Sequence, residues 1–284
     1  MLYFCADDYG MSAEGNDRIE ECLQKGALNK VSVLPNGRIP DFFQRLSGDA
    51  ALLALHLNLI EGRPLSDPGD VKLLVTEDGH FKYSFIGLFL LSLSPKRKAL
   101  EQQLYREIQC QIRFWKQSVG ESVPVAVDSH QHTHMIPLIF KTLLRVIREE
   151  GLQVDYLRIP AEPLTPYLLT PSLYLSYRPA GLVKQWLLKA MALVSRREWK
   201  KANIPSGYFL GVLFSGHLTK GCIQKLLPHY ARLAQKHHCH IELGFHPGYM
   251  AGNDDRIPGS RADFGKFYHS PWRKVEYDTL MNFK

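Results

Sequence analysis

The sequence predicts an α/β fold in which a mostly parallel sheet curls into a barrel related to the (β/α)8 type. Short apolar runs alternate along the chain with longer segments of helical periodicity, a pattern that favours strands joined by crossover helices. Six or seven such units follow one another over 284 residues without a break in composition. This number fits a barrel better than an open sheet, and it predicts a single domain over residues 1–284.

The first part of the chain contains three short apolar runs that read as buried strands. These strands are expected at 2–5, 31–34 and 52–59. Ser12 is expected to cap the helix after the first strand, and Gly26 to end that helix. Residues 60–95 are harder to assign, and we expect them to pass over the surface with a turn at 77–79.

The second part begins with the clearest helix, at 95–119, where apolar residues recur every four positions. Further strands are expected at 123–127, 154–159, 208–214 and 240–245, with helices starting at Pro137 and Leu218. Residues 161–205 interrupt the alternation, because they are rich in Pro, Tyr and Leu and then become basic. We interpret them as a variable insertion in the barrel.

The overall composition limits the classes of protein. The net charge of +7 permits weak attraction to anionic surfaces, but it establishes no partner, and we expect no nucleic-acid ligand. No apolar run approaches the roughly 18 residues that a membrane span needs, and no signal peptide is visible. Five cysteines without a Cys-x-x-Cys pair indicate reduced thiols and a cytoplasmic protein.

Side chains that can carry charge or bind metals gather where the predicted strands end. They are Asp7, Asp8, His56, Asp128, His130, His132, His134, Arg158 and His246. The carboxyl ends of parallel barrel strands share one face, and that face carries the chemistry. Because a buried unpaired charge is costly, five strand ends that supply carboxylates or imidazoles are hard to explain as packing.

The pair Asp7-Asp8 is the strongest single signal. Adjacent residues that leave a strand point in different directions. One carboxylate can therefore bind a metal while the other faces a substrate as a base. The structural alternative is a turn that leads into a helix, where Asp is common.

The segment from Asp128 to His134 places imidazoles at alternate positions. If the segment is extended, His130, His132 and His134 lie on one side, which suits a metal or an anion. Asp128 is of the type that orients a ligating imidazole through its second nitrogen. His56 lies inside an apolar strand; with one carboxylate and a second imidazole it would form a facial metal-binding set.

Two further strand-end residues are candidates for direct roles. His246 can donate a proton to a leaving group, because an imidazole titrates near neutrality, although a hydrogen bond to backbone would also explain it. Arg158 can hold a carboxylate or a substrate oxygen by a forked contact, and a plain surface ion pair is the alternative.

Taken together, these motifs resemble those of the YdjC-like carbohydrate deacetylases. The matching segments are Ala6-Asp7-Asp8-Tyr9-Gly10, His56-Leu-Asn-Leu followed by Gly62-Arg63-Pro64-Leu65, Asp128-Ser-His130-Gln-His132-Thr-His134, and Glu242-Leu-Gly-Phe-His246-Pro-Gly. The resemblance runs in order from residue 1 to about 250. It implies a distorted (β/α) barrel of the glycoside hydrolase/deacetylase type and removal of the N-acetyl group from an amino sugar.

The resemblance also implies roles for individual residues. Asp8, His56 and His130 match the ligands of one divalent metal ion, Mg²⁺ or Zn²⁺. Asp7 matches the catalytic base, and His246 matches the general acid. Asp128, His132, His134 and Arg158 would contact the substrate or support the ligands. Members of this family are often homodimers, and residues 161–205 match it poorly, which leaves the sugar undefined.

Three alternatives stay open. A metal-dependent phosphoesterase would share the ligands on the same barrel. A non-catalytic carbohydrate-binding protein would use aromatic residues such as Tyr83, Phe85, Tyr167 and Trp272. The basic amphipathic stretch 181–201 would give peripheral membrane contact if it lay on lipid, whereas packing on the barrel or at a dimer contact is the simpler interpretation.

Overall fold

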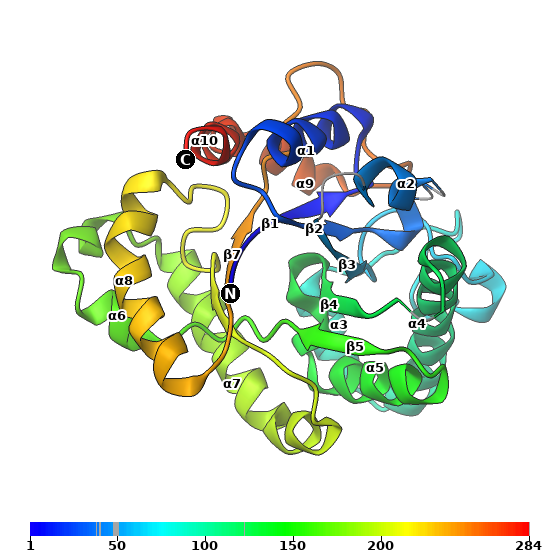
Figure 1. The fold of residues 1–284 in the computed structure, drawn as a ribbon. Helices are drawn as coiled ribbons and strands as arrows, with labels where there is room; N and C mark the ends of the chain where they lie inside the picture. Colours follow the sequence, from blue (N-terminus) through cyan, green and yellow to red (C-terminus); the bar gives the residue numbers. More distant parts are fainter. Residues whose placement is uncertain (38, 40, 48–50, 122, 284) are drawn as a thin grey trace.

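The computed structural model describes residues 1–37, 39, 41–47, 51–121 and 123–283. Within these residues seven parallel strands form one sheet in the order β5-β4-β3-β2-β1-β7-β6. The strands are β1 (Leu2–Tyr9), β2 (Lys30–Val33), β3 (Leu52–Leu57), β4 (Val125–Ser129), β5 (Val154–Leu157), β6 (Tyr208–Leu210) and β7 (Ile241–Phe245). The sheet curls around a central axis with helices outside it (Figure 1), which confirms the predicted α/β class.

The helices occupy the segments between the strands and the tail that follows β7. They are α1 (Ala13–Lys25), α2 (Phe42–Ser47), α3 (Phe85–Ser92), α4 (Arg97–Val119), α5 (Pro137–Glu149), α6 (Leu164–Leu168), α7 (Pro179–Ala202), α8 (Lys220–His237), α9 (Ala262–Tyr268) and α10 (Pro271–Met281). Short 3₁₀ segments are η1 (Pro35–Gly37), η2 (Pro68–Asp70), η3 (His130–Met135) and η4 (Pro171–Ser176). Ser12 caps α1 by accepting the Gly15 N–H, as predicted.

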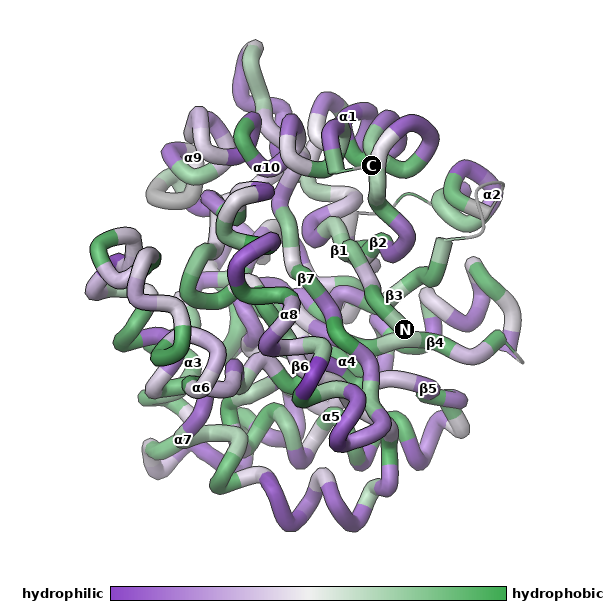
Figure 2. Tube along the Cα trace, turned by 60° about the vertical axis from the view of Figure 1, so that its left-hand side comes forward, coloured by the Kyte–Doolittle hydropathy of each residue, from purple (hydrophilic) through white to green (hydrophobic). Residues whose placement is uncertain are grey.

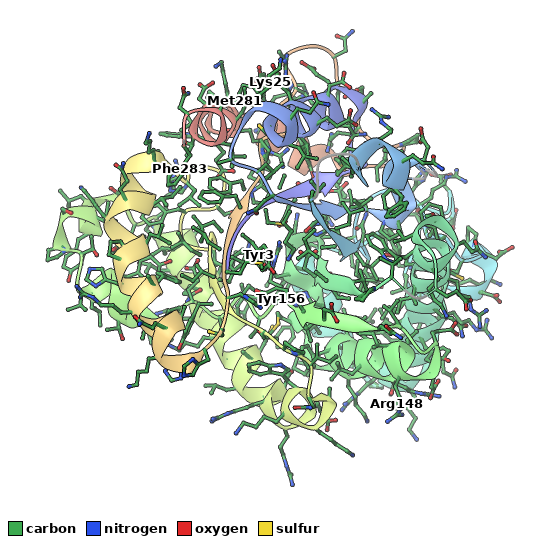
Figure 3. The ribbon with its side chains drawn as sticks, in the orientation of Figure 1. Tyr3, Lys25, Arg148, Tyr156, Met281 and Phe283 are labelled. Carbon is green, nitrogen blue, oxygen red and sulfur yellow. The ribbon has the colours of Figure 1, made fainter. Side chains whose placement is uncertain are left out.

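The two edges of the curled sheet approach each other without forming a ladder among the described residues. Leu157 N at the end of β5 donates to Pro205 O, just before β6, at 2.9 Å. The architecture is therefore a seven-stranded half-barrel, consistent with a distorted barrel. Figure 3 shows its interior filled with side chains, and at the end where the chain starts the rings of Tyr3 and Tyr156 meet edge to face, 6.2 Å apart.

Two strand boundaries differ from the sequence prediction in ways that shape the site. β1 continues to Tyr9 instead of ending at Cys5, so that Asp7 and Asp8 belong to the strand. β6 ends at Leu210 instead of residue 214. The reason is that the buried carboxylate of Glu162 accepts the backbone N–H groups of Gly211, Val212 and Leu213, which takes them out of the sheet.

The prediction that residues 60–95 only pass over the surface is wrong. Side chains of this segment enter the core, among them Ile60, Val71, Leu74 and Phe81. The segment also contains α3, which the sequence reading missed. The turn at 77–79 is confirmed, and Val75 pairs with Phe81 across it in an antiparallel bridge.

The region 161–205 folds as α6, η4 and α7 between β5 and β6. Leu188 and Met191 of α7 are buried, and α7 packs against α5 and η3. No helix in the described part of the chain is long and apolar enough to cross a bilayer. The five cysteines are free, as predicted; the cytoplasmic location stays a prediction.

Candidate metal centre and active site

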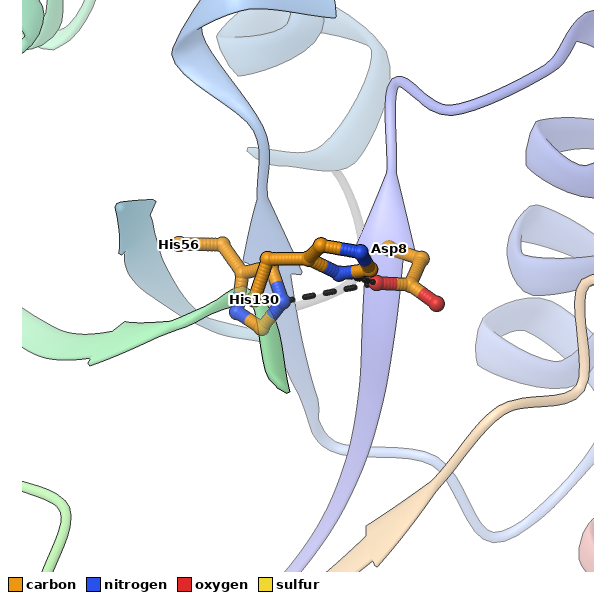
Figure 4. Close-up of side chains that lie close together, drawn as sticks. All are labelled: Asp8, His56 and His130. Atoms are coloured by element: carbon orange, nitrogen blue, oxygen red, sulfur yellow. Dashed lines mark hydrogen bonds and ion pairs between the residues drawn. The ribbon is translucent and has the colours of Figure 1, made fainter. Parts of the chain in front are cut away.

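Asp8, His56 and His130 converge from three strand ends. Asp8 Oδ1 lies 2.7 Å from His130 Nδ1 and 3.4 Å from His56 Nε2. One ligand atom of each residue lies within 4.8 Å of the others, and all three side chains are buried. Figure 4 shows the two imidazoles directed at the same carboxylate.

The donor atoms of this set suit a divalent cation. The Nε2 atoms of His56 and His130 are buried, and neither has a hydrogen-bond partner among the described residues. Buried polar atoms are normally paired, so two orphaned imidazole nitrogens beside one carboxylate indicate a ligand that satisfies them. One carboxylate and two imidazoles form a set that binds a first-row divalent metal and leaves positions open. These residues fit the predicted metal.

A β-bulge explains how two adjacent aspartates both reach the site. The register of β1 against β2 shifts between Ala6 and Tyr9, and Asp8 has φ +71°. A bulge redirects side chains that a regular strand would send to opposite faces. Asp is among the few residues other than Gly that tolerate this left-handed region.

His56 is held in place by Asp128 on the neighbouring strand. His56 Nδ1 lies 2.6 Å from Asp128 Oδ1, and Ser32 Oγ donates to Asp128 Oδ2 at 2.6 Å. Burial would lower the pKa of His56, but the charge and hydrogen bond of Asp128, with help from Asp8 and Asp7, raise that pKa to about 10. Asp128 thus fixes the ring so that its Nε2 faces Asp8.

The guanidinium of Arg158 forms a bidentate salt bridge with the carboxylate of Asp7. Its Nη1 donates to Asp7 Oδ2 at 2.7 Å and its Nη2 donates to Asp7 Oδ1 at 2.8 Å. Burial would raise the pKa of Asp7, but the guanidinium outweighs burial and holds this pKa well below its usual range. Asp7 is therefore an ionised carboxylate that also lines the active-site cavity.

The alternative reading of Arg158 as a surface ion pair is wrong. The side chain is fully buried inside the barrel, where it also contacts Asp128 at 2.7 Å and Glu242. Lys30 Nζ donates to Glu242 at 2.8 Å. Because these two cations already pair with the surrounding carboxylates, the described residues around Asp128 and Glu242 form an ion-pair cluster rather than a second metal site. Arg158 does not line the cavity, so its side chain is not placed to contact a substrate directly.

Residues 128–134 are not extended throughout, so the three imidazoles do not lie on one side. The segment turns into η3, and Gln131 and His132 have left-handed backbone angles. His130 consequently faces Asp8, whereas His132 lines the cavity with its ring edge-on to Phe209. His134 points elsewhere: its Nδ1 contacts Ser129 Oγ at 2.5 Å and its Nε2 lies 2.8 Å from the Arg158 carbonyl oxygen.

The site opens into a cavity of about 200 Å³. Its lining residues are Asp7, Asp8, His56, His130, Gln131, His132, Lys184, Ser215, His246, Phe267 and Tyr268. The volume is below the roughly 300–1,000 Å³ of sites for drug-sized ligands, so it suits a single small group or the end of a chain. Of the four aromatic residues considered for sugar stacking, none lines this cavity, and Tyr167 is buried in the core.

His246 follows β7 and is 17% exposed in its side chain. Its backbone N–H donates to Glu276 Oε2 at 2.6 Å, and its Nδ1 lies 3.5 Å from the same oxygen. Glu276 is fully buried on α10 and also accepts the Leu218 N–H at 3.0 Å. Glu276 thus anchors the backbone of His246, and the residue lines the cavity.

Sequence reasoning missed several residues of the site. Arg273 of α10 donates to Asp8 Oδ2 at 2.8 Å and to Gly248 O at 2.8 Å, and its guanidinium lies 4.0 Å from the centre of the Tyr268 ring. Burial would raise the pKa of Asp8, but His130, with help from His56 and the charge of Arg273, holds that pKa well below its usual value. Pro271 at the start of α10 signals a helix, but nothing in the sequence indicates that Arg273 reaches Asp8.

Lys184 is the other missed residue, and it comes from the insertion. It is half-buried on α7 and lines the cavity. Burial lowers the pKa of Lys184, against the attraction of Glu162, Asp7 and Asp8. It places a cation beside the carboxylates, and the basic composition of the stretch 181–201 was the only signal for it.

A family model described as YdjC-like protein matches residues 1–283. A structure from Enterococcus faecalis V583, named as a proposed cellobiose-phosphate cleavage protein, is 18% identical over 99% of this chain and 90% of that chain, with a TM-score of 0.61. At this identity the likeness shows the fold alone. An AP endonuclease, family 2, from Brucella melitensis is 13% identical over 96% of this chain and 100% of that chain, but its TM-score of 0.41 is too low to support a conclusion.

The family model matches nearly the whole sequence, and this match shows that the chain belongs to the YdjC-like protein family.

Proposed function

We propose that the protein is a metal-dependent hydrolase that removes the N-acetyl group from an N-acetylated amino sugar and releases acetate. The observation that carries this proposal is the convergence of Asp8, His56 and His130 on one point, with Asp7 and His246 facing the same cavity. The resemblance to carbohydrate deacetylases supports it, and the name of the Enterococcus faecalis structure also refers to a carbohydrate.

Asp8, His56 and His130 would hold the cation. When bound, a divalent cation supplies Lewis-acid polarisation of the acetyl carbonyl and acidifies a water molecule. Asp128 orients His56 for this task, and Arg273 with Tyr268 restrains the outer oxygen of Asp8. The chain thus fixes both imidazoles and the carboxylate before any ligand arrives, which lowers the cost of assembling the site.

Asp7 would act as the base. Its carboxylate is ionised and oriented by Arg158, so it can accept the proton of an attacking water. The same pairing makes Asp7 a weak base, so its contribution depends on a water that is already acidified. His246, which also lines the cavity, would give a proton to the departing amine, while Glu276 anchors the residue.

The test measures acetate released from N-acetylglucosamine oligomers by protein stripped with a chelator and reloaded with Mg²⁺ or Zn²⁺. We expect activity only after reloading, and a loss of about 100-fold or more in Asp7→Asn, as for removal of a general base. Asp155→Asn, on the exposed side of β5, is the matched control. Full activity in Asp7→Asn would remove Asp7 from the mechanism. Phosphate release from sugar phosphates with two bound metal equivalents would replace the proposal with a phosphoesterase.

A further inference from the structure

The insertion exposes an unusual amount of apolar surface. Fifteen large apolar side chains are exposed among the described residues, and nine of them fall between Leu168 and Val194. They are Leu168, Leu169, Tyr174, Leu175, Leu182, Val183, Trp186, Leu193 and Val194. Scattered exposed apolar residues are normal, but a concentration of this kind in one segment marks an interaction surface.

Helix α7 has a buried face and, opposite it, an exposed apolar face. Its buried residues, Gln185, Leu188, Met191 and Ser195, fall on the side that packs against the barrel. At about 100° per residue, the five exposed apolar residues of α7 lie within an arc of about 120° on the opposite side. The simpler interpretation of this helix, packing on the barrel, therefore accounts for one face only and leaves the second without a partner in the described chain.

The charge around this face is predominantly positive. Residues 163–197 contain no Asp or Glu, whereas Arg178, Arg196 and Arg197 are exposed and Lys189 is half-buried, and Glu198 near the end of α7 is the one acidic residue of the helix. Figure 2 shows α7 turning from hydrophobic to hydrophilic along its length, with α3, α6 and α7 on the side of the molecule away from the N-terminus. α3 has a similar character: Ile86, Leu90 and Leu93 are exposed, and residues 79–100 also contain no acidic residue.

These observations distinguish between two partners for the exposed face of α7, a second copy of the chain and a lipid surface. A second copy docked symmetrically through this face would bring the same cations together, and α7 offers only Glu198, near its end, to pair with them. An anionic lipid surface complements both properties, because leucine, valine and tryptophan enter the interface while arginine and lysine meet the head groups. We propose that the outer face of α7, with residues 168–175, docks the protein on anionic phospholipid.

The same part of α7 contributes to the cavity and to the docking face. Lys184 of α7 lines the cavity, while Leu182, Val183 and Trp186 from the same two turns point outward. A membrane that contacts this face would therefore be separated from the cavity by the thickness of α7, about 10 Å. The inference rests on the surface alone and does not require the deacetylase proposal.

The test is sedimentation of the full chain with vesicles of phosphatidylcholine alone or mixed with phosphatidylglycerol, at low and high salt. Val183→Asp alters the docking face, and Val123→Asp is the matched control; these two valines are 68% and 38% exposed, so neither change should disturb the core. We expect the wild type and Val123→Asp to sediment with the vesicles that contain phosphatidylglycerol and not with phosphatidylcholine alone. High salt should reduce this binding, and Val183→Asp should bind the anionic vesicles about fivefold less than the wild type.

Two results would overturn the inference: failure of the wild type to bind anionic vesicles at low salt, or unchanged binding by Val183→Asp. A dimer of the wild type that becomes monomeric in Val183→Asp, with no vesicle binding, would assign the face to a second copy instead. Acetate release from a soluble oligomer is measured in parallel. It should be the same in all three proteins, which separates a failure of docking from a failure of the proposed chemistry.

Discussion

Arg158 and Asp7, 151 positions apart in the sequence, are joined by two parallel hydrogen bonds of 2.7 and 2.8 Å inside the barrel. The contact ties the end of β1 to the residue that follows β5, across most of the sheet. It gives the proposed base a fixed orientation and a constant negative charge. This pair therefore contributes both to the stability of the fold and to the proposed role of Asp7 as a base.

Replacing Arg158 should destabilise the protein strongly. Arg158→Met leaves Asp7, Asp128 and Glu242 without the guanidinium that contacts all three, and breaking such a network costs about 3 to 5 kcal/mol. Urea denaturation measures the change in unfolding free energy. Arg148→Met is the control, because Arg148 is exposed, as Figure 3 shows. Equal stability of the two variants would contradict the role given to the cluster.

Removing the charge of Asp128 should weaken metal binding without removing a ligand. Asp128→Asn cannot accept from His56 Nδ1 with the strength of a carboxylate, so the ring loses its orientation. We expect Zn²⁺ affinity to fall by about 10- to 100-fold, the usual effect of losing such a partner. Competition with a fluorescent chelator gives the affinity. An unchanged dissociation constant would show that His56 needs no such support.

Lys184 should attract the anionic product. In Lys184→Met the inhibition constant for acetate should rise by about three- to tenfold, because one cation at the cavity wall is lost. Lys189→Met, whose side chain lies against Trp186 outside the cavity, should leave the constant unchanged. Inhibition by acetate in a steady-state assay measures both variants, and an equal response from the two would exclude a role for Lys184 in anion binding.

His134 should make stability depend on pH. Burial lowers its pKa to about 4, so between pH 4 and 6.5 the unfolded chain binds a proton that the folded chain does not. The contribution is complete above pH 6.5 and is lost as the pH falls toward 4, by about 2 to 3 kcal/mol. Urea denaturation across this range, compared with His134→Gln, should show a shallower decline for the variant. Parallel curves would refute the assignment.

The sequence predicted the site residues that lie at strand ends and missed those that lie in helices. Asp8, His56 and His130 each follow a short apolar run, and parallel strand ends must meet, so their convergence could be expected. Arg273 and Lys184 lie in helices of the tail and the insertion, where no periodicity indicates which strand they cover. The histidine run was misjudged for a local reason: two left-handed residues turn the chain and separate three imidazoles that an extended segment would align.

The central claim is that Asp8, His56 and His130 together hold one divalent cation. Metal content by mass spectrometry, after stripping and reloading with Zn²⁺, tests it most directly. The wild type should retain one equivalent, as should His237→Ala at the exposed end of α8, whereas His56→Ala and His130→Ala should retain almost none. Retention of a full equivalent by either of the last two variants, with their folds intact, would contradict the account.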